Sequence, residues 1–130
     1  MDTQLKSVAE DCLNGSYEGR MDFPTVLGKL AAVGFEGYLV DYRKGTTTYY
    51  LSDGDSVEFE NVATPGTVAP AFSPDTVGAN VRQSQSNAQT YTAFCKNVKN
   101  AGCAAYIVSI PGKRVVYFGR TGEKHVEIMP

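Results

Sequence analysis

Apolar residues recur at helical spacing near the start of the chain. In residues 3–18 they follow an i, i+3, i+4, i+7, i+8 pattern, which predicts an amphipathic helix. A second helix is predicted over 23–33, because Asp22 stands at its N-cap position and Gly34 can supply a left-handed C-cap. Helices over 74–86, after the cap and proline of Ser73-Pro74, and over 88–101 complete the set.

Six shorter segments alternate as strands do, and each group of three follows a helix pair. They are predicted over 37–43, 46–51, 56–60, 105–110, 114–119 and 124–129. We expect three-residue turns at 43–45, 111–113 and 120–122, and a two-residue turn at Asp53-Gly54.

These turn lengths decide which side chains share a face of the sheet. The helix-covered face is predicted to hold Tyr38, Val40, Tyr42, Thr48, Tyr50, Val57 and Phe59, then Tyr106, Val108, Ile110, Val116, Phe118, Val126 and Ile128. The outer face is predicted to hold Leu39, Asp41, Tyr49, Leu51, Glu58 and Glu60, then Ile107, Ser109, Val115, Tyr117, His125 and Glu127. Its apolar members predict that something covers part of it.

The second half resembles the first at an offset of 68 residues, which aligns 23–59 with 91–127. We therefore predict one α+β domain over 1–130, built from two helix-helix-meander repeats related by a pseudo-two-fold. The sheet is predicted to be mostly antiparallel and backed by helices. The repeat units cover about 1–60 and 73–130, and a connection rich in Pro, Gly and Ala joins them over 61–72.

Charge is distributed unevenly along the chain. The net charge is −2 overall, but it is −6 for residues 1–68 and +4 for 69–130. This asymmetry is either a property of solvated surfaces or electrostatic complementarity, between the repeats or between subunits of a homodimer. The chain has no dense basic stripe, so nucleic-acid binding is not expected.

Apolar runs are too short for a membrane span, so no membrane insertion is expected. The N-terminus lacks a secretory signal, and three cysteines (Cys12, Cys95, Cys103) are most consistent with reduced thiols in the cytoplasm. The sequence has no metal-ligand cluster and no phosphate-binding glycine loop, so no metal, cofactor or established catalytic residue is predicted.

The candidate ligand-binding residues are Tyr49, Tyr117, His125 and Glu127, on the predicted outer face. His125 is the only histidine, and Glu127 lies two residues further on the same face, where its carboxylate can bias the histidine's protonation. With the Tyr117 hydroxyl they form a candidate acid–base set. The alternatives are a solvated histidine and tyrosines that only pack.

The C-terminal half carries a family resemblance in Tyr91–Cys95, Ala101–Ser109, Val116–Glu127 and Pro130, and Asp41–Gly54 adds to it. The chain resembles the YbcV-like family (domain of unknown function 1398) of uncharacterised enterobacterial and prophage proteins. Some members are labelled phage envelope proteins, and the resemblance implies no catalytic residues. The leading hypothesis is a small cytosolic binding or regulatory module with a small-molecule ligand. An enzyme using His125, Glu127 and Tyr117 and a phage-associated accessory or structural protein are the alternatives.

Overall fold

A computed structural model describes residues 1–129, and Pro130 lies outside the described part. Its elements are α1 (Thr3–Tyr17), α2 (Phe23–Ala32), β1 (Phe35–Asp41), β2 (Thr46–Leu51), β3 (Ser56–Glu60), α3 (Pro74–Gln85), α4 (Tyr91–Asn100), β4 (Cys103–Ser109), β5 (Arg114–Gly119) and β6 (Lys124–Ile128). The six strands form one antiparallel sheet in the order β3-β2-β1-β4-β5-β6. The predicted α+β class is confirmed.

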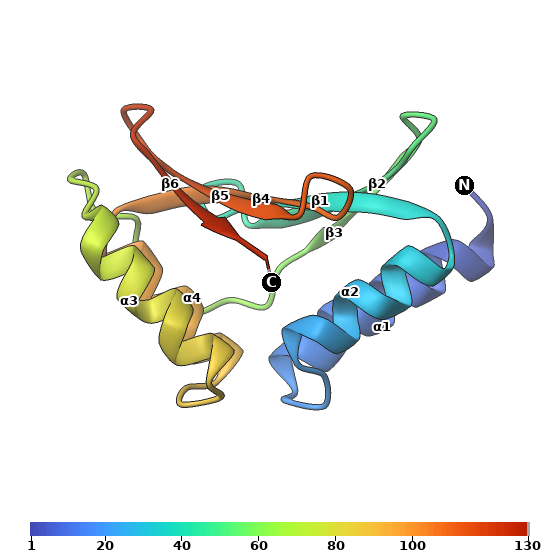
Figure 1. Cartoon of the computed structure of the whole chain (residues 1–130), viewed down its shortest axis with the longest axis horizontal. Helices are drawn as coiled ribbons and strands as arrows, with labels where there is room; N and C mark the ends of the chain where they lie inside the picture. Colours follow the sequence, from blue (N-terminus) through green and yellow to red (C-terminus); the bar gives the residue numbers. More distant parts are fainter. Residues whose placement is uncertain (130) are drawn as a thin grey trace.

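All four helices lie on one side of the sheet (Figure 1). The α1–α2 pair and the α3–α4 pair stand apart from each other, and the described residues place no helix on the opposite side. We call that opposite side the open face. None of the described helices has the length and apolar character needed to cross a membrane.

Local capping explains where the helices begin and end. The Asp22 carboxylate accepts a hydrogen bond from the Thr25 amide at 3.0 Å, and this N-cap fixes the start of α2. The Thr90 hydroxyl accepts from the Ala93 amide at 3.1 Å, so α4 begins at Tyr91 rather than at residue 88. Gly34 and Gly102 follow α2 and α4 at positive φ, as the C-cap pattern predicts.

The two halves have the same element order, and α2 with β1–β3 recurs 68 residues later as α4 with β4–β6. The β1–β4 ladder pairs Leu39 with Ile107, and the register is symmetric about this pair because Tyr38 faces Val108 and Val40 faces Tyr106. A duplication predicts that the Cα traces of the two halves superpose about an axis through this pair.

The predicted core is confirmed in the central strands and the helices above them. Tyr38, Val40, Tyr106 and Val108 are buried, as are Leu30, Phe94 and Val98 on α2 and α4, and Leu27 is half-buried. The burial of these side chains holds the helices on the sheet.

Two of the predicted turn types are wrong, and the error moves whole strands to the other face. The first hairpin turns through four residues, because Asp41 pairs with Thr46, and the second does so because Ser109 pairs with Arg114. Gly45 and Lys113, at the last turn position, have positive φ. The Asp41 carboxylate accepts from two turn amides at 3.0 Å each and stabilises this longer turn.

The prediction of a two-residue turn at Asp53-Gly54 is also wrong, because this turn has three residues like its counterpart at 120–122. The Leu51 amide donates a hydrogen bond to the Asp55 carbonyl across this turn, and Tyr49 therefore pairs with Val57. The predicted turns differed in length by one residue between the two halves. In the structure both turns have three residues, so this difference is absent. The pairing of Tyr117 with His125 is as predicted.

These registers reverse the predicted faces of β2, β5 and β6. The helix-covered side carries Tyr49, Val115, Tyr117, His125 and Glu127, which were expected on the outer face. It also carries Thr47, in place of the expected Thr48. The open face carries Thr48, Tyr50, Val116, Phe118, Val126 and Ile128, which were expected inside.

Candidate functional site

A deep groove lies between the two helix pairs, above the covered face of the sheet. Its volume is about 1080 Å³, which is slightly above the usual range for small-molecule sites. Its floor and walls are lined mainly by apolar and aromatic side chains of both halves. Lining residues include Phe23, Leu27, Tyr38, Val40, Tyr49, Val81, Tyr91, Phe94, Tyr106, Val115, Tyr117 and Glu127.

Four tyrosines form a row across the floor of this groove. Their order is Tyr49, Tyr38, Tyr106 and Tyr117, and neighbouring ring centroids lie 5.2, 6.4 and 5.2 Å apart. We call these four residues the tyrosine row. Tyr49 and Tyr117 stand at equivalent strand positions in the two halves, as do Tyr38 and Tyr106, so the floor repeats the symmetry of the β1–β4 ladder. Ring pairs at this spacing hold one another in a fixed arrangement.

The hydroxyl groups of the tyrosine row differ in their hydrogen bonding. The Tyr106 hydroxyl is 2.6 Å from the hydroxyl of Tyr91 on α4. The hydroxyls of Tyr38, Tyr49 and Tyr117 have no hydrogen-bond partner among residues 1–129. Their residues are only 8, 2 and 5 % exposed, but the hydroxyl oxygens themselves border the groove and are open to water. Among the described residues, the one fully buried side-chain oxygen without a partner is the hydroxyl of Tyr42. A hydroxyl that borders a groove hydrogen-bonds to water there, and a ligand group can take the place of that water. These three groups therefore offer free hydrogen-bonding capacity on the groove floor.

Burial also fixes the protonation state of these hydroxyls. Desolvation raises the pKa of Tyr38, Tyr49 and Tyr117 above the ordinary tyrosine range. Each hydroxyl consequently keeps its proton at neutral pH and can donate a hydrogen bond. The acid–base hypothesis required Tyr117 to transfer a proton at neutral pH. Its raised pKa makes Tyr117 unsuited to this role.

His125 and Glu127 lie together at the β6 end of the groove, on the helix-covered face instead of the predicted outer face. His125 Nε2 is 2.6 Å from Glu127 Oε1, and Arg82 Nη1 on α3 is 3.9 Å from the same oxygen. Gly78 on α3 makes room for the imidazole, because a Cβ there would lie 3.1 Å from His125 Nε2. Glu127 lines the groove and His125 does not.

The corresponding positions in the first half are apolar. Val57 stands where the second half has His125, and Phe59 stands where it has Glu127. The ring of Phe59 packs on Tyr49 at 6.2 Å, while the imidazole of His125 packs near Tyr117 at 6.4 Å. The tyrosines of the groove floor therefore repeat in both halves, whereas the pair of His125 and Glu127 occurs in the second half only.

All four predicted site residues lie near this groove, and three of them line it: Tyr49, Tyr117 and Glu127. Sequence reasoning missed Tyr38 and Tyr106 as site residues, because buried tyrosines on central strands are typical of a core. It also missed the wall residues Phe23, Leu27 and Phe94. The equal spacing of tyrosines in both halves was the signal that could have found the row.

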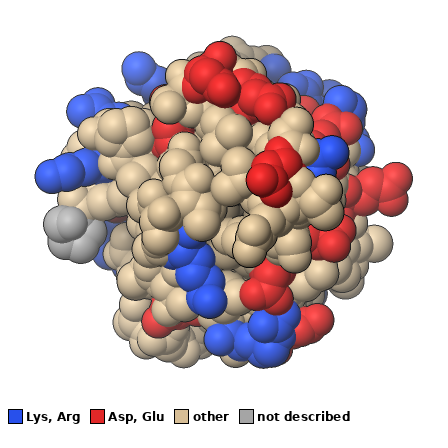
Figure 2. Space-filling view, turned by 90° about the vertical axis from the view of Figure 1, so that its right-hand side faces the viewer, with Lys and Arg blue, Asp and Glu red and all other residues tan. Residues whose placement is uncertain are grey.

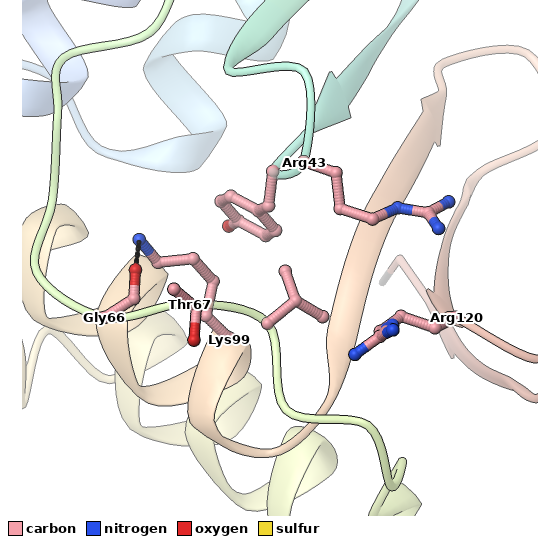
Figure 3. Close-up of a pocket in the computed structure, with 7 residues that line it drawn as sticks. Arg43, Gly66, Thr67, Lys99 and Arg120 are labelled. Carbon is pink, nitrogen blue, oxygen red and sulfur yellow. Dashed lines mark hydrogen bonds between the residues drawn. The ribbon is translucent and has the colours of Figure 1, made fainter.

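A smaller hollow of about 370 Å³ lies on another part of the surface, beside Arg43, Lys99 and Arg120 (Figure 3). These three cations do not converge. Lys99 is buried, and its ammonium donates hydrogen bonds to Thr64 and to the Gly66 carbonyl, on the opposite side of the hollow from both guanidinium groups. Lys99 thus anchors the 61–72 connection to α4 and does not form an anion site.

The three cysteines are free thiols buried in the core. Burial raises the pKa of Cys103 to about 12 and also raises the pKa of Cys12 and Cys95. High thiol pKa values are opposite to those of a nucleophilic cysteine. Within residues 1–129 no group of three or more His, Cys, Asp or Glu side chains could hold a metal ion.

The fold and groove define a small α+β protein with a ligand-sized, tyrosine-floored groove between two helix pairs. A family model described as "Protein of unknown function (DUF1398)" matches residues 14–127. The chain belongs to this family, whose description assigns no function. No curated protein matches the chain.

Proposed function

We propose that this protein is a binding module for a small molecule held in the groove above the tyrosine row. The observation that carries the proposal is the set of three tyrosine hydroxyls that border an apolar groove and have no protein partner among the described residues. Apolar walls with a few placed polar groups are typical of small-molecule sites. A bound molecule would supply the hydrogen-bond acceptors that the protein itself does not.

The groove favours a planar, mainly apolar and uncharged ligand with carbonyl, ether or ring-nitrogen acceptors. The aromatic floor favours stacking and edge contacts with planar groups. The lining carboxylates are already engaged: Glu127 is bonded to His125, and Asp22 caps α2. Lys113 also lines the groove, so the lining carries charges of both signs and selects neither a cation nor an anion. The polar pair at one end would fix the direction in which an asymmetric ligand lies.

Nile red tests this proposal, because it is planar, uncharged and carries a carbonyl acceptor, and its fluorescence rises in apolar sites. We expect saturable binding to the wild type. Two changes should weaken it: Leu27→Trp, which fills the groove from α2, and the combination of Tyr49→Phe with Tyr117→Phe, which removes two hydroxyl donors. A lost hydrogen bond of about 1 kcal/mol corresponds to roughly fivefold weaker binding, and the loss of two corresponds to roughly thirtyfold.

The matched control is Tyr50→Phe, since Tyr50 is the neighbour of Tyr49 and points to the open face. This variant should bind Nile red like the wild type. No saturable binding, or equal binding by the Leu27→Trp variant, would contradict the proposal. If Nile red binds as expected, native mass spectrometry of protein purified from its host can identify a natural ligand by the mass that is lost on denaturation.

An acid–base role is the second candidate function, favoured by the short contact between His125 and Glu127. A carboxylate bonded to an imidazole orients a general base. This candidate predicts that the wild type converts a ligand recovered from the groove and that a His125→Gln variant binds that ligand without converting it. Equal conversion by both proteins would exclude it.

The proposal also includes a cytoplasmic location, supported by three unpaired buried thiols, which suit a reducing compartment. The narrower YbcV-like assignment and a prophage association rest on the resemblance described above. A phage structural role is not favoured by any feature of the groove.

A further inference from the structure

The open face of the sheet carries a row of four apolar side chains on neighbouring strands, with a threonine at one end. The pairing places Thr48, Leu39, Ile107, Val116 and Val126 side by side across β2, β1, β4, β5 and β6. We call these five residues the open-face row. Ile107 is 42 % exposed and Val126 37 %. A solvated sheet face would carry polar side chains at these central positions.

The pattern of β6 is the reverse of what burial alone would select. His125 and Glu127 point to the covered side, while Val126 and Ile128 point to the open face, where Ile128 is 62 % exposed. Exposed apolar side chains that adjoin one another mark a surface that another molecule covers. The reversal on β6 therefore indicates that the open face is buried in the working form of the protein.

Charged residues flank the open-face row with opposite sign at its two ends. On β3 the open face carries Glu58 and Glu60, and on β5 and β6 it carries Arg114 and Lys124. Lys44 from the first turn neutralises part of this charge through a 2.8 Å contact with Glu58, while Glu60 has no ion pair among residues 1–129. Figure 2 looks at the end of the molecule formed by the first half, where acidic and basic side chains are both spread over the surface.

We propose that the open face binds a second copy of this chain in a face-to-face homodimer. A two-fold axis in the interface, parallel to β1 and β4, places the β3 edge of one copy over the β6 edge of the other. Glu60 then faces Lys124 of the second copy twice, and Leu39 faces Ile107 twice. A two-fold axis across the strands instead places Glu58 against Glu58. The charge distribution therefore selects the first arrangement.

The shape of the sheet agrees with this arrangement. A two-fold copy has the same twist, and two sheets of equal twist pack face to face with their strands roughly parallel, about 10 Å apart. The helices and the groove remain on the outside of such a dimer, because they lie on the other side of the sheet (Figure 1). The proposal is thus independent of ligand binding in the groove.

Sedimentation equilibrium over a concentration series tests the dimer with the full chain. We expect the wild type to dimerise and Ile107→Lys to be monomeric at the same concentrations, because it places a lysine in the centre of the open-face row. Glu60→Lys and Lys124→Glu should each weaken the dimer by about tenfold, since each creates two like-charge contacts. The double variant restores opposite charges and should regain most of the affinity.

The matched control is Lys96→Glu, a charge reversal at an exposed position of α4 on the helical side. It should dimerise like the wild type, and circular dichroism should show that every variant is folded. A monomeric wild type at high micromolar concentration overturns the proposal. So does a dimer that withstands Ile107→Lys, or a double charge variant weaker than both single ones, because these results place the contact elsewhere.

Discussion

The hydroxyls of Tyr106 and Tyr38 allow a direct measurement of what a hydrogen-bond partner contributes to this fold. The two residues occupy equivalent positions on β4 and β1, and both are buried. The Tyr106 hydroxyl lies 2.6 Å from that of Tyr91, whereas the Tyr38 hydroxyl has no partner among the described residues. Replacing either tyrosine with phenylalanine removes one oxygen and leaves the ring in place.

The two substitutions are expected to change the free energy of unfolding by different amounts. Tyr106→Phe loses a net hydrogen bond and leaves the Tyr91 hydroxyl without its partner, which should lower stability by about 1–3 kcal/mol. Tyr38→Phe removes a hydroxyl that has no protein partner and borders the groove, where water can solvate it, so it should change stability by less than about 0.5 kcal/mol.

Urea unfolding followed by circular dichroism measures both values, and the slope of the transition should be unchanged in both variants. The double variant of Tyr91 and Tyr106 to phenylalanine is the control, because removing both hydroxyls leaves no unpaired group and should cost less than Tyr106→Phe alone. Equal losses for Tyr38→Phe and Tyr106→Phe would refute the reasoning. They would mean that the Tyr38 hydroxyl is bonded in solution and is not available to a ligand.

Three further predictions concern the core, a close backbone approach and a buried thiol. Val108→Ala should lower the free energy of unfolding by roughly 1–4 kcal/mol, because it leaves a cavity in the buried face, and a loss of only a few tenths would contradict its burial. Gly102→Ala should be more damaging in the same urea assay than Gly34→Ala. Both have positive φ, but only at Gly102 would the new Cβ lie 2.1 Å from the carbonyl oxygen of Ala71. The raised pKa of Cys103, about 12 when folded, means that stability is fully present below the unfolded thiol value of about 8.5 and falls as pH rises toward 12. Urea midpoints at pH 7.5 and 10 should show this fall, and Cys103→Ala should reduce it.

The sequence predicted the helices and the central strands because their signals are local and one-sided. Asp22 and Gly34 bracket α2, and the alternation in β1 and β4 places valine and tyrosine on one side. The faces of β2 and β5 could not be obtained in this way. Thr47 and Tyr49 are matched by Thr48 and Tyr50 on the other face. The choice then depended on turn length, and an error of one residue exchanges the faces of the whole strand.

For β6 the alternation of apolar and polar residues predicted the wrong face for every side chain of the strand. The hydrophobic rule places Val126 and Ile128 inside, and the structure places His125 and Glu127 there. Departures from local rules are expected at functional positions. The four predicted site residues do lie on one face of the sheet, but this face is the helix-covered side and not the predicted outer side. The groove itself could not be predicted, since its shape depends on how far apart the two helix pairs stand.

The symmetric ladder between β1 and β4 has a consequence for how the chain can be divided. Leu39 and Ile107 mark its centre, and each half contributes one strand to it. A chain cut within 61–72 would expose β1 in one fragment and β4 in the other as open edges with matching registers. The two fragments are therefore expected to reassociate without a covalent link. Because the register is the same from either side, the first fragment alone presents an edge that can pair with another copy of itself.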